Sequence, residues 1–177
     1  MKYNGKSLAL CGLFCALLII SSKIQIPTPV IPFTLQTPIF LLTALFLPNF
    51  LATVTIGVYL LLGLIGLPVF AQGGGLYYLL NPTFGYLIGF FIASVIKAIF
   101  FKNANSTFKS RVILCLTTVF IAHLVGNLYS FLVLKYHLGT QITFLQNFLV
   151  NGLIFIPIDF IWAFLCPAFI KNKKARV

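Results

Sequence analysis

The sequence predicts an all-α integral membrane protein with six transmembrane helices, folded as one membrane-embedded domain over residues 1–177. The first observation is composition, since 60% of the residues are hydrophobic and only 7% are charged, whereas a soluble domain is about one quarter charged. The second is a mean hydropathy of +1.09. Such a chain would expose an adhesive apolar surface to water, so membrane lipid is the expected solvent for most of it.

Apolar runs close to the length that a helix needs to cross the hydrocarbon, about 20 residues, place the elements in order. The predicted spans cover residues 6–24, 34–47, 49–67, 82–101, 111–135 and 144–170. The first run follows Lys2 and Lys6, as in a signal peptide, but ISS at residues 20–22 is a poor cleavage site. We therefore expect a retained span. The second run is short and contains Pro38.

Lys and Arg residues favour one side of the predicted membrane. Six spans place both termini and the connections between spans two and three and between four and five on the same side. That side has nine Lys and Arg residues and the other side has two: Lys2, Lys6, Lys102, Lys109, Arg111, Lys171, Lys173, Lys174 and Arg176, opposite Lys23 and Lys135. By the positive-inside rule, both termini are expected in the cytoplasm. Lys97 is expected to snorkel toward the same side.

The two outward loops have unusual compositions. Residues 24–33 (IQIPTPVIPF) contain three prolines, which predict a stiff, non-helical segment. Residues 68–82 contain three consecutive glycines and two tyrosines, and the glycines permit close backbone approach. Either loop alone could be a plain connector. Together on one face, and almost without charge, they favour a lid over a cavity.

Asp159 is the only acidic residue in the chain, and it lies inside the apolar run IPIDFIW. A carboxylate in the middle of a span is costly. A purely structural aspartate is one interpretation, but no cationic partner is near in sequence and no second acid could form a proton relay. We therefore expect Asp159 to accept hydrogen bonds from a ligand. Pro157, just before it, is expected to loosen the helix and free a carbonyl in a wet pocket.

Other polar residues fall in or beside the predicted spans. Asn81 and Pro82 are residue types that start a helix, so the fourth span is expected to begin there, with free N–H groups that suit an anion. Asn127 and Asn151 lie at mid-membrane positions, and His123 is one turn before Asn127. Intramembrane amides often only bond a neighbouring helix. Contact with a ligand is the alternative, and it is also considered for Gln36 at the start of the second span.

Gly12 and Ala16 place a stripe of small residues on the first span. Small residues four apart let two membrane helices approach closely. The partner helix could belong to the same chain or to another protein.

Several function classes are excluded by what the sequence lacks. The net charge of +11 is not arranged as a basic helix face, which argues against nucleic acid. GGG at residues 73–75 lacks the lysine of a phosphate loop. The four cysteines and two histidines have no metal-site spacing, so neither a metal nor a cofactor is expected. A single carboxylate cannot supply the paired acids of a membrane-embedded hydrolase. We therefore expect a binding protein and not an enzyme.

Four stretches carry a resemblance to a known family: IPTPVIPFTLQT (26–37), GLIGLPVFAQGGG (63–75), NPTFGYLIGF (81–90) and PIDFIW (157–162). They resemble the BioY family, the biotin-capturing S components of energy-coupling-factor (ECF) transporters. The resemblance implies a multi-pass protein of the bacterial plasma membrane that binds biotin near the outer surface with high affinity. It also implies partners, namely a transmembrane T component, docked on Gly12 and Ala16, and two ABC ATPases that hydrolyse ATP.

The resemblance also assigns roles to residues. Asp159 and Asn81 are expected to bind the ureido ring of biotin, and Tyr86, Phe70, Tyr77 and Tyr78 to pack against its apolar rings. Related sequences often have a lysine three residues after the aspartate, where this chain has Trp162. Lys23, or the amides at the start of the fourth span, would then hold the biotin carboxylate. An S component for thiamine or riboflavin is the alternative, and a small membrane-embedded enzyme is a more distant one.

Overall fold

The computed structural model describes residues 5–26, 31–100, 107–153 and 155–170. Its α-helices are α1 (Gly5–Lys23), α2 (Gln36–Phe46), α3 (Asn49–Leu64), α4 (Phe84–Phe100), α5 (Phe108–Leu132), α6 (Phe144–Asn147) and α7 (Ile156–Ala168). A hairpin of β1 (Gln25–Ile26) and β2 (Phe33–Thr34) follows α1. Shorter helical turns are the 3₁₀ turn η1 (Leu76–Leu80) and the π-helical turns η2 (Val133–His137) and η3 (Phe148–Gly152).

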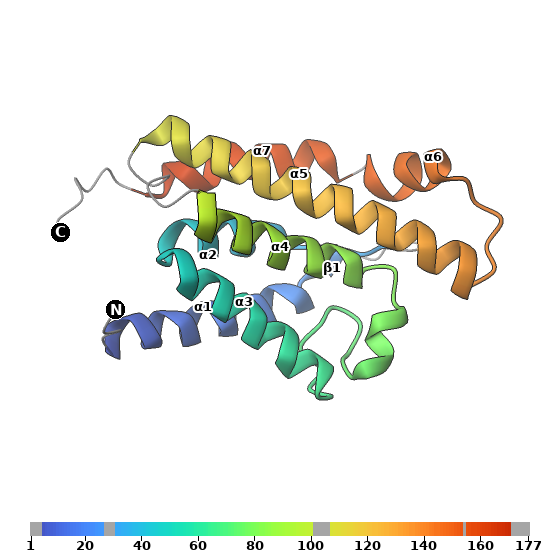
Figure 1. The fold of residues 1–177 in the computed structure, drawn as a ribbon, viewed down its shortest axis with the longest axis horizontal. Helices are drawn as coiled ribbons and strands as arrows, with labels where there is room; N and C mark the ends of the chain where they lie inside the picture. Colours follow the sequence, from blue (N-terminus) through green and yellow to red (C-terminus); the bar gives the residue numbers. More distant parts are fainter. Residues whose placement is uncertain (1–4, 27–30, 101–106, 154, 171–177) are drawn as a thin grey trace.

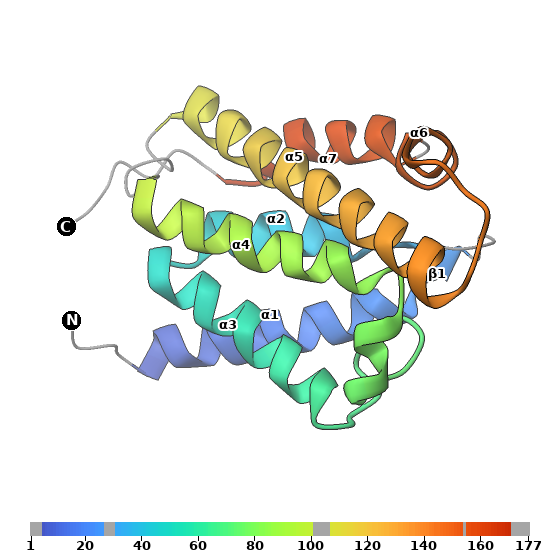
Figure 2. The same ribbon diagram turned by 45° about the vertical axis from the view of Figure 1, so that its right-hand side comes forward.

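Six of the helices form a closed ring of neighbours. Around the ring, α1 packs on α3, α3 on α4, α4 on α5, α5 on α7, α7 on α2, and α2 on α1. Seen from the side, α5 and α7 form one layer, α4 and α2 the next, and α3 and α1 the last (Figures 1 and 2). The ring arrangement lets helices far apart in sequence line one common interior.

The predicted spans coincide with helices, but their lengths differ from the prediction. Among the described residues, α1 and the continuous segment Phe108–His137 are long and apolar enough to cross a membrane, while α2, α3 and α4 are shorter apolar helices. The predicted sixth span, 144–170, is not one helix: α6 and η3 form one part and α7 the other, at an angle of 52°. Pro157 lies in the first turn of α7, a position where the missing N–H of proline leaves no bond unmade.

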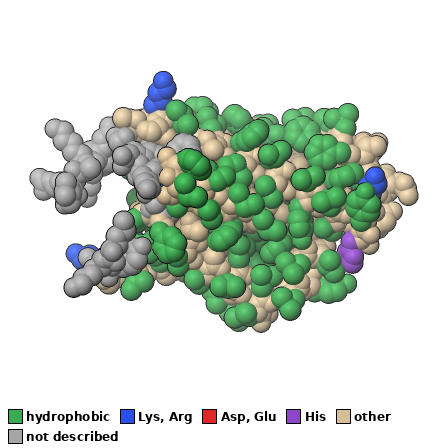
Figure 3. Space-filling view, viewed as in Figure 1, with side chains coloured by type: hydrophobic (Ala, Val, Ile, Leu, Met, Phe, Trp, Pro, Cys, Tyr) green, Lys and Arg blue, Asp and Glu red, His purple; other side chains and the backbone are tan. Residues whose placement is uncertain are grey.

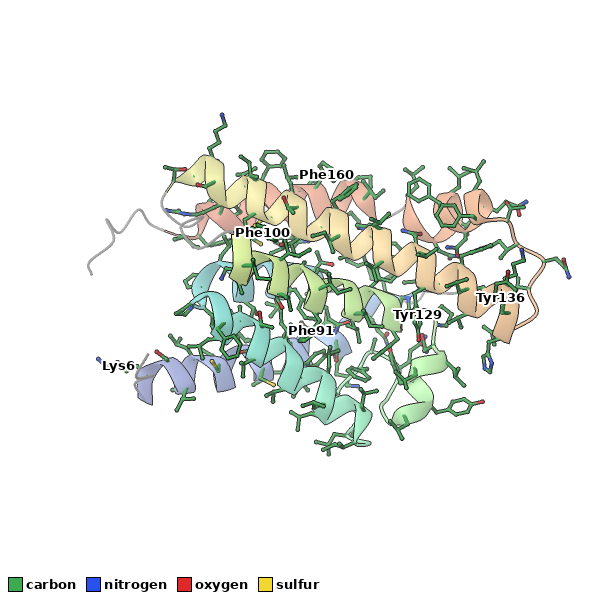
Figure 4. The ribbon with its side chains drawn as sticks, viewed as in Figure 1. Lys6, Phe91, Phe100, Tyr129, Tyr136 and Phe160 are labelled. Atoms are coloured by element: carbon green, nitrogen blue, oxygen red, sulfur yellow. The ribbon has the colours of Figure 1, made fainter. Side chains whose placement is uncertain are left out.

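The two ends of the bundle differ in their connections. The start of α1, the turn between α2 and α3, and the end of α7 lie at the left end in Figure 1. The β1–β2 hairpin, η1 and the α5–α6 connection lie at the right end (Figure 1). Figure 4 shows Lys6 at the left end and Tyr136 at the right. The basic residues Lys2, Lys102, Lys171, Lys173, Lys174 and Arg176 lie outside the described residues.

The surface between the two ends is apolar, and many polar side chains are inside. Figure 3 shows a nearly continuous hydrophobic face with Lys and Arg only toward the ends. Exposed residues of α5 include Phe120 and Leu124, whereas Asn127, Ser130 and His123 of the same helix are buried. This distribution suits a protein whose solvent is lipid and whose interior holds polar groups.

Lys97 bonds to the α2–α3 turn, at the same end of the bundle as Lys6, but its side chain is buried there. Its side chain is 1% exposed, and Nζ donates a hydrogen bond of 2.8 Å to the carbonyl of Leu47, just after α2. Arg111 is also buried and donates to the carbonyl of Ile170, two residues after α7. Both cations therefore donate hydrogen bonds to carbonyls just after helix C-termini.

The loop between α3 and α4 folds back on α3 through its glycines. Gly75 has φ of +96° and its N–H donates to the carbonyl of Gly63 at 2.6 Å. The ring of Phe70 fills the space above Gly63, where a side chain would clash. Lys23 Nζ donates to the Phe70 carbonyl at 2.6 Å, which fastens the loop to the end of α1. The close backbone approach expected for the triple glycine is confirmed.

Small residues bring α4 and α5 into close contact. Gly85 and Gly89 on α4 face Tyr129 and Ala122 on α5, and Gly126 of α5 faces the ring of Tyr86. A Cβ atom at Gly89 would lie 2.7 Å from the Cα atom of Ala122, which is main chain and cannot move aside cheaply. Here, small residues four apart therefore bring together two helices of the same chain.

We expect Gly89→Ala to lower the free energy of unfolding by about 1–3 kcal/mol, because the added methyl group overpacks the α4–α5 contact. The measurement is the thermal unfolding midpoint of the purified protein in detergent. Gly12→Ala is the matched control, since no atom lies within 4 Å of a Cβ at that position. Equal midpoints for the two variants would contradict the close-packing interpretation.

Candidate functional site

A cavity lies inside the helix ring toward the end with the two loops. It has about 680 Å³ of unfilled space, counting the part open to solvent. Four helices and both outer loops contribute to its wall: Ile31, Pro32, Phe33, Thr34, Gln36, Thr37, Ala71, Tyr78, Thr83, Tyr86, Leu87, Phe90, Val119, Ala122, His123, Phe155 and Asp159. The two predicted lid loops thus meet at one cavity.

Asp159 lies in the first turn of α7, directly after the break in the chain's last helical segment. Its side chain is 8% exposed, and Oδ2 is 2.8 Å from Nε2 of His123 on α5. The first turn of a helix favours a negative charge, because its N–H groups and dipole are positive there. Two features of the fold, a helix start and an imidazole, therefore stabilise the only acid of the chain.

The second carboxylate oxygen of Asp159, Oδ1, has no hydrogen-bond partner among the described residues. The residue itself lines the cavity. An ionised carboxylate has several acceptor positions and no donor. Asp159 can therefore accept hydrogen bonds from N–H or O–H groups of a molecule inside the cavity while His123 holds its other oxygen. Phe160, the next residue, points outward from α7 (Figure 4) and is 46% exposed.

His123 is positioned by its neighbours on α4 and α5. The ring of Tyr86 meets it edge to face, with centroids 5.7 Å apart. Tyr86 is held against Gly126, and its hydroxyl donates to the carbonyl of Asn151 in η3 at 3.2 Å. A carbonyl next to the helix break is thereby satisfied inside the protein, as the membrane interior requires.

Gln36 connects the cavity wall to the core. Its amide Nε2 donates to the Tyr59 hydroxyl at 2.7 Å, and the Tyr59 hydroxyl donates to the carbonyl of Val69. Thr34, in β2, donates to Oε1 of Gln36 at 3.1 Å. The amide has two N–H groups, and Nε2 has one hydrogen-bond acceptor among the described residues.

Tyr78 and Thr83 form a second polar group in the wall. The Thr83 hydroxyl donates to Oδ1 of Asn81 at 2.7 Å, so its oxygen must accept from the Tyr78 hydroxyl at 3.0 Å. Burial raises the pKa of the Tyr78 hydroxyl, although the bond to Thr83 acts against this. Tyr78 therefore remains a neutral donor over the physiological pH range.

Aromatic rings supply the apolar part of the wall. Phe33 of β2 stacks on Phe155, just before α7, with centroids 6.0 Å apart and planes 3° apart. Phe90 on α4 stacks on Phe40 of α2 at 4.2 Å and also lines the cavity. Phe33, Phe155 and Phe90 give a ligand in the cavity an apolar surface to pack against.

The structure brings four of the predicted ligand-binding residues to the cavity wall and places the others elsewhere. Asp159, Gln36, Tyr86 and Tyr78 line it. Phe70 is fully buried in the core, and Lys23 is bonded to its carbonyl. Residues not among those lining the cavity are Asn81, Lys23, Asn127, Asn151 and Phe70.

Asn81 acts locally, at the start of α4. Its Oδ1 accepts from the backbone N–H of Thr83 at 2.9 Å as well as from the Thr83 hydroxyl, and its Nδ2 donates to Gln72. These bonds form a turn at Asn81 between η1, which ends at Leu80, and α4, which begins at Phe84. They also occupy the side-chain groups that were expected to bind a ureido ring.

Asn127 and Asn151 belong to an amide network between α5 and the helical turns α6 and η3. Asn147 Nδ2 donates to the Asn127 carbonyl at 3.1 Å, while its Oδ1 accepts from Asn151 and from Ser130. The side chain of Asn127 itself donates to the His123 carbonyl of its own helix, and that of Asn151 donates to Asn147 in its own segment. Asn147 is therefore the amide that joins the two segments.

Sequence reasoning missed the partner of Asp159. His123 is 36 residues earlier in the chain and on a different helix, so no local pattern joins the two. The signal was a lone histidine in an apolar run, one turn before Asn127. Phe33, Thr83 and Phe155 were also missed, although Phe33 and Thr83 lie in stretches 26–37 and 81–90, which carry the family resemblance.

Within the described residues, no group of three or more His, Cys, Asp or Glu side chains could hold a metal ion. His123 and Asp159 are only a pair.

Comparisons with known proteins place these features in a family. The sequence model of the BioY family matches residues 1–177. A protein of Lysinibacillus sphaericus named "Probable biotin transporter BioY" is 35% identical over 172 residues, 97% of this chain and 87% of that protein. One of Pyrococcus horikoshii with the same name is 31% identical over 161 residues, 90% of this chain and 91% of that protein.

A "Biotin transporter BioY" of Thermotoga maritima is 37% identical over 102 residues, 57% of this chain and 60% of that protein. Among solved structures, the S component for biotin from an ECF-type ABC transporter matches with a TM-score of 0.80 at 28% identity, over 96% of this chain and 92% of that chain. With a family model that spans all 177 residues and relatives that match nearly end to end, the chain belongs to the BioY family.

Proposed function

We propose that this chain is a high-affinity biotin-binding membrane subunit, the S component of an ECF-type vitamin uptake transporter, and not an enzyme. The observation that carries the proposal is the cavity whose single carboxylate, Asp159, is held by His123 with one oxygen available to a ligand. The relatives named as biotin transporters and the solved S component for biotin support the choice of ligand.

The chemistry of biotin matches the wall of the cavity. Its ureido group has two N–H donors and one carbonyl acceptor. Asp159 Oδ1 accepts from the N–H side, and the spare N–H of Gln36 can serve the carbonyl. The fused apolar rings then pack among Phe33, Phe90 and Tyr86. Thiamine and riboflavin, the alternative vitamins, are not favoured by the named relatives.

The placement in the membrane and the partners form the finer part of the proposal. We propose six spans in the bacterial plasma membrane, with the start of α1 and the end of α7 at the cytoplasmic side. Uptake would need a T component and two ABC ATPases, because nothing in the chain's motifs binds ATP. Gly12 and Ala16 are exposed on α1, as a docking face for the T component requires.

The test of the substrate is saturable binding. We expect the purified chain in detergent to bind labelled biotin with a dissociation constant below about 1 μM, a free energy near −8 kcal/mol. Excess thiamine or riboflavin should not displace the label. A folded sample that shows no saturable biotin binding, or that loses its label to thiamine, would contradict the proposed ligand.

Asp159→Asn should weaken biotin binding by about 10- to 100-fold, because a hydrogen bond to a charged acceptor contributes about 1.5–3 kcal/mol. The asparagine retains an oxygen for His123 Nε2, so the variant should fold. Isothermal titration gives the affinity, and the unfolding midpoint gives the folding control. Unchanged affinity in a folded variant would rule out Asp159 as the ureido acceptor.

Gly12→Leu and Ala16→Leu should leave biotin affinity unchanged and prevent association with the T component, because a bulky side chain blocks close helix approach. The measurement is co-purification with the T component and ATPases. Leu124→Phe, on the exposed face of α5, is the control and should assemble normally. Intact assembly of both α1 variants would argue against this docking face.

A further inference from the structure

No Lys or Arg among the described residues lines the cavity. The side chains of the wall that can carry charge are Asp159 and His123, and these are bonded to each other. Together they are neutral at most, when the imidazole is protonated, and otherwise negative. Biotin carries a carboxylate at the end of its valeryl chain, so the wall offers that group no net positive charge.

The described cations are all engaged or located elsewhere. Lys23 is held by the Phe70 carbonyl, and Lys135 lies over the rings of Phe131 and Tyr136 at the loop end of α5. The others belong to the opposite end of the bundle, at the start of α1, the end of α4 and the start of α5: Lys6, Lys97, Lys109 and Arg111. None of these residues is among those that line the cavity.

Trp162 lies three residues after Asp159 on α7. Its indole packs against the core cluster that contains Leu41, Leu114 and Cys166, and it is not among the cavity residues. The position three residues after Asp159 is therefore filled by apolar packing in this chain. A cation cannot act on the ligand from there.

A carboxylate buried in this cavity would be unfavourable for two reasons. It would lose its hydration without gaining a cation, and it would lie near the like charge of Asp159. The cavity is open to solvent on one side. A ligand that places its ring system against Asp159 and leaves its acid in water at the opening avoids both costs.

We propose that this site recognises the ureido ring system and not the acid, so that neutral carboxyl derivatives of biotin bind about as well as biotin itself. The ligand class is a cyclic urea fused to an apolar ring, with a side chain of either charge state. This inference rests on the proposed function, because it presupposes that biotin occupies the cavity.

The experiment is competition against labelled biotin on the purified full chain in detergent. The competitors are biotin, biotin methyl ester, biotinamide and lipoic acid, which has the same pentanoic acid chain and no ureido group. We expect the ester and the amide to compete within about fivefold of biotin, and lipoic acid to be weaker by at least about 100-fold.

The outcomes separate the two proposals. If biotin binds but the ester and the amide are both more than about fivefold weaker, the acid is recognised and the inference is overturned. If biotin itself does not bind, the proposed function fails first. A second measurement is the affinity for biotin at about 50 mM and about 500 mM NaCl, which should agree within about twofold because no exposed ion pair is screened. A larger loss in high salt would also overturn the inference.

Discussion

The bond between His123 and Asp159 joins the two parts of the molecule on which the cavity depends. An isolated carboxylate in an apolar bundle is unstable unless it is paired or lies at a favourable helix end, and Asp159 has both kinds of support. The helix start exists because the last helical segment is broken before Ile156. Breaking that segment therefore creates the place for the acid, and α5 supplies its partner.

The helix break in turn depends on the amides around it. A broken helix exposes carbonyl and N–H groups that lipid cannot satisfy. Here Tyr86 bonds the Asn151 carbonyl, and Asn147 bridges to α5. Tyr86 reaches that carbonyl because Gly126 leaves room for its ring. Close α4–α5 packing, the satisfied break and the placement of His123 are thus consequences of the same small residues.

The sequence predicted elements better than it predicted contacts. Hydropathy located every helix of the ring, and the isolated acid identified the main cavity residue. Composition could not show that the run 144–170 is broken, because a helix break that is surrounded by protein does not lower the hydropathy of the sequence. Composition also could not assign a role to Asn81, because an asparagine can either start a helix or bind a ligand. The His123–Asp159 pair required the packing of α5 on α7, which is a property of the whole ring.

Four of the described cations are stabilised without a carboxylate. Lys23, Lys97 and Arg111 donate to backbone carbonyls at 2.6, 2.8 and 2.7 Å, and Lys135 lies over aromatic rings. The acceptors of Lys97 and Arg111 lie just after helix ends, where carbonyls are partially negative and lack intrahelical partners, and the acceptor of Lys23 is a loop carbonyl. If Lys or Arg were paired with Asp159, that pair would bury the one strong acceptor that the cavity has. Because backbone and rings satisfy the described cations instead, Asp159 is left with His123 alone and keeps an oxygen for the ligand.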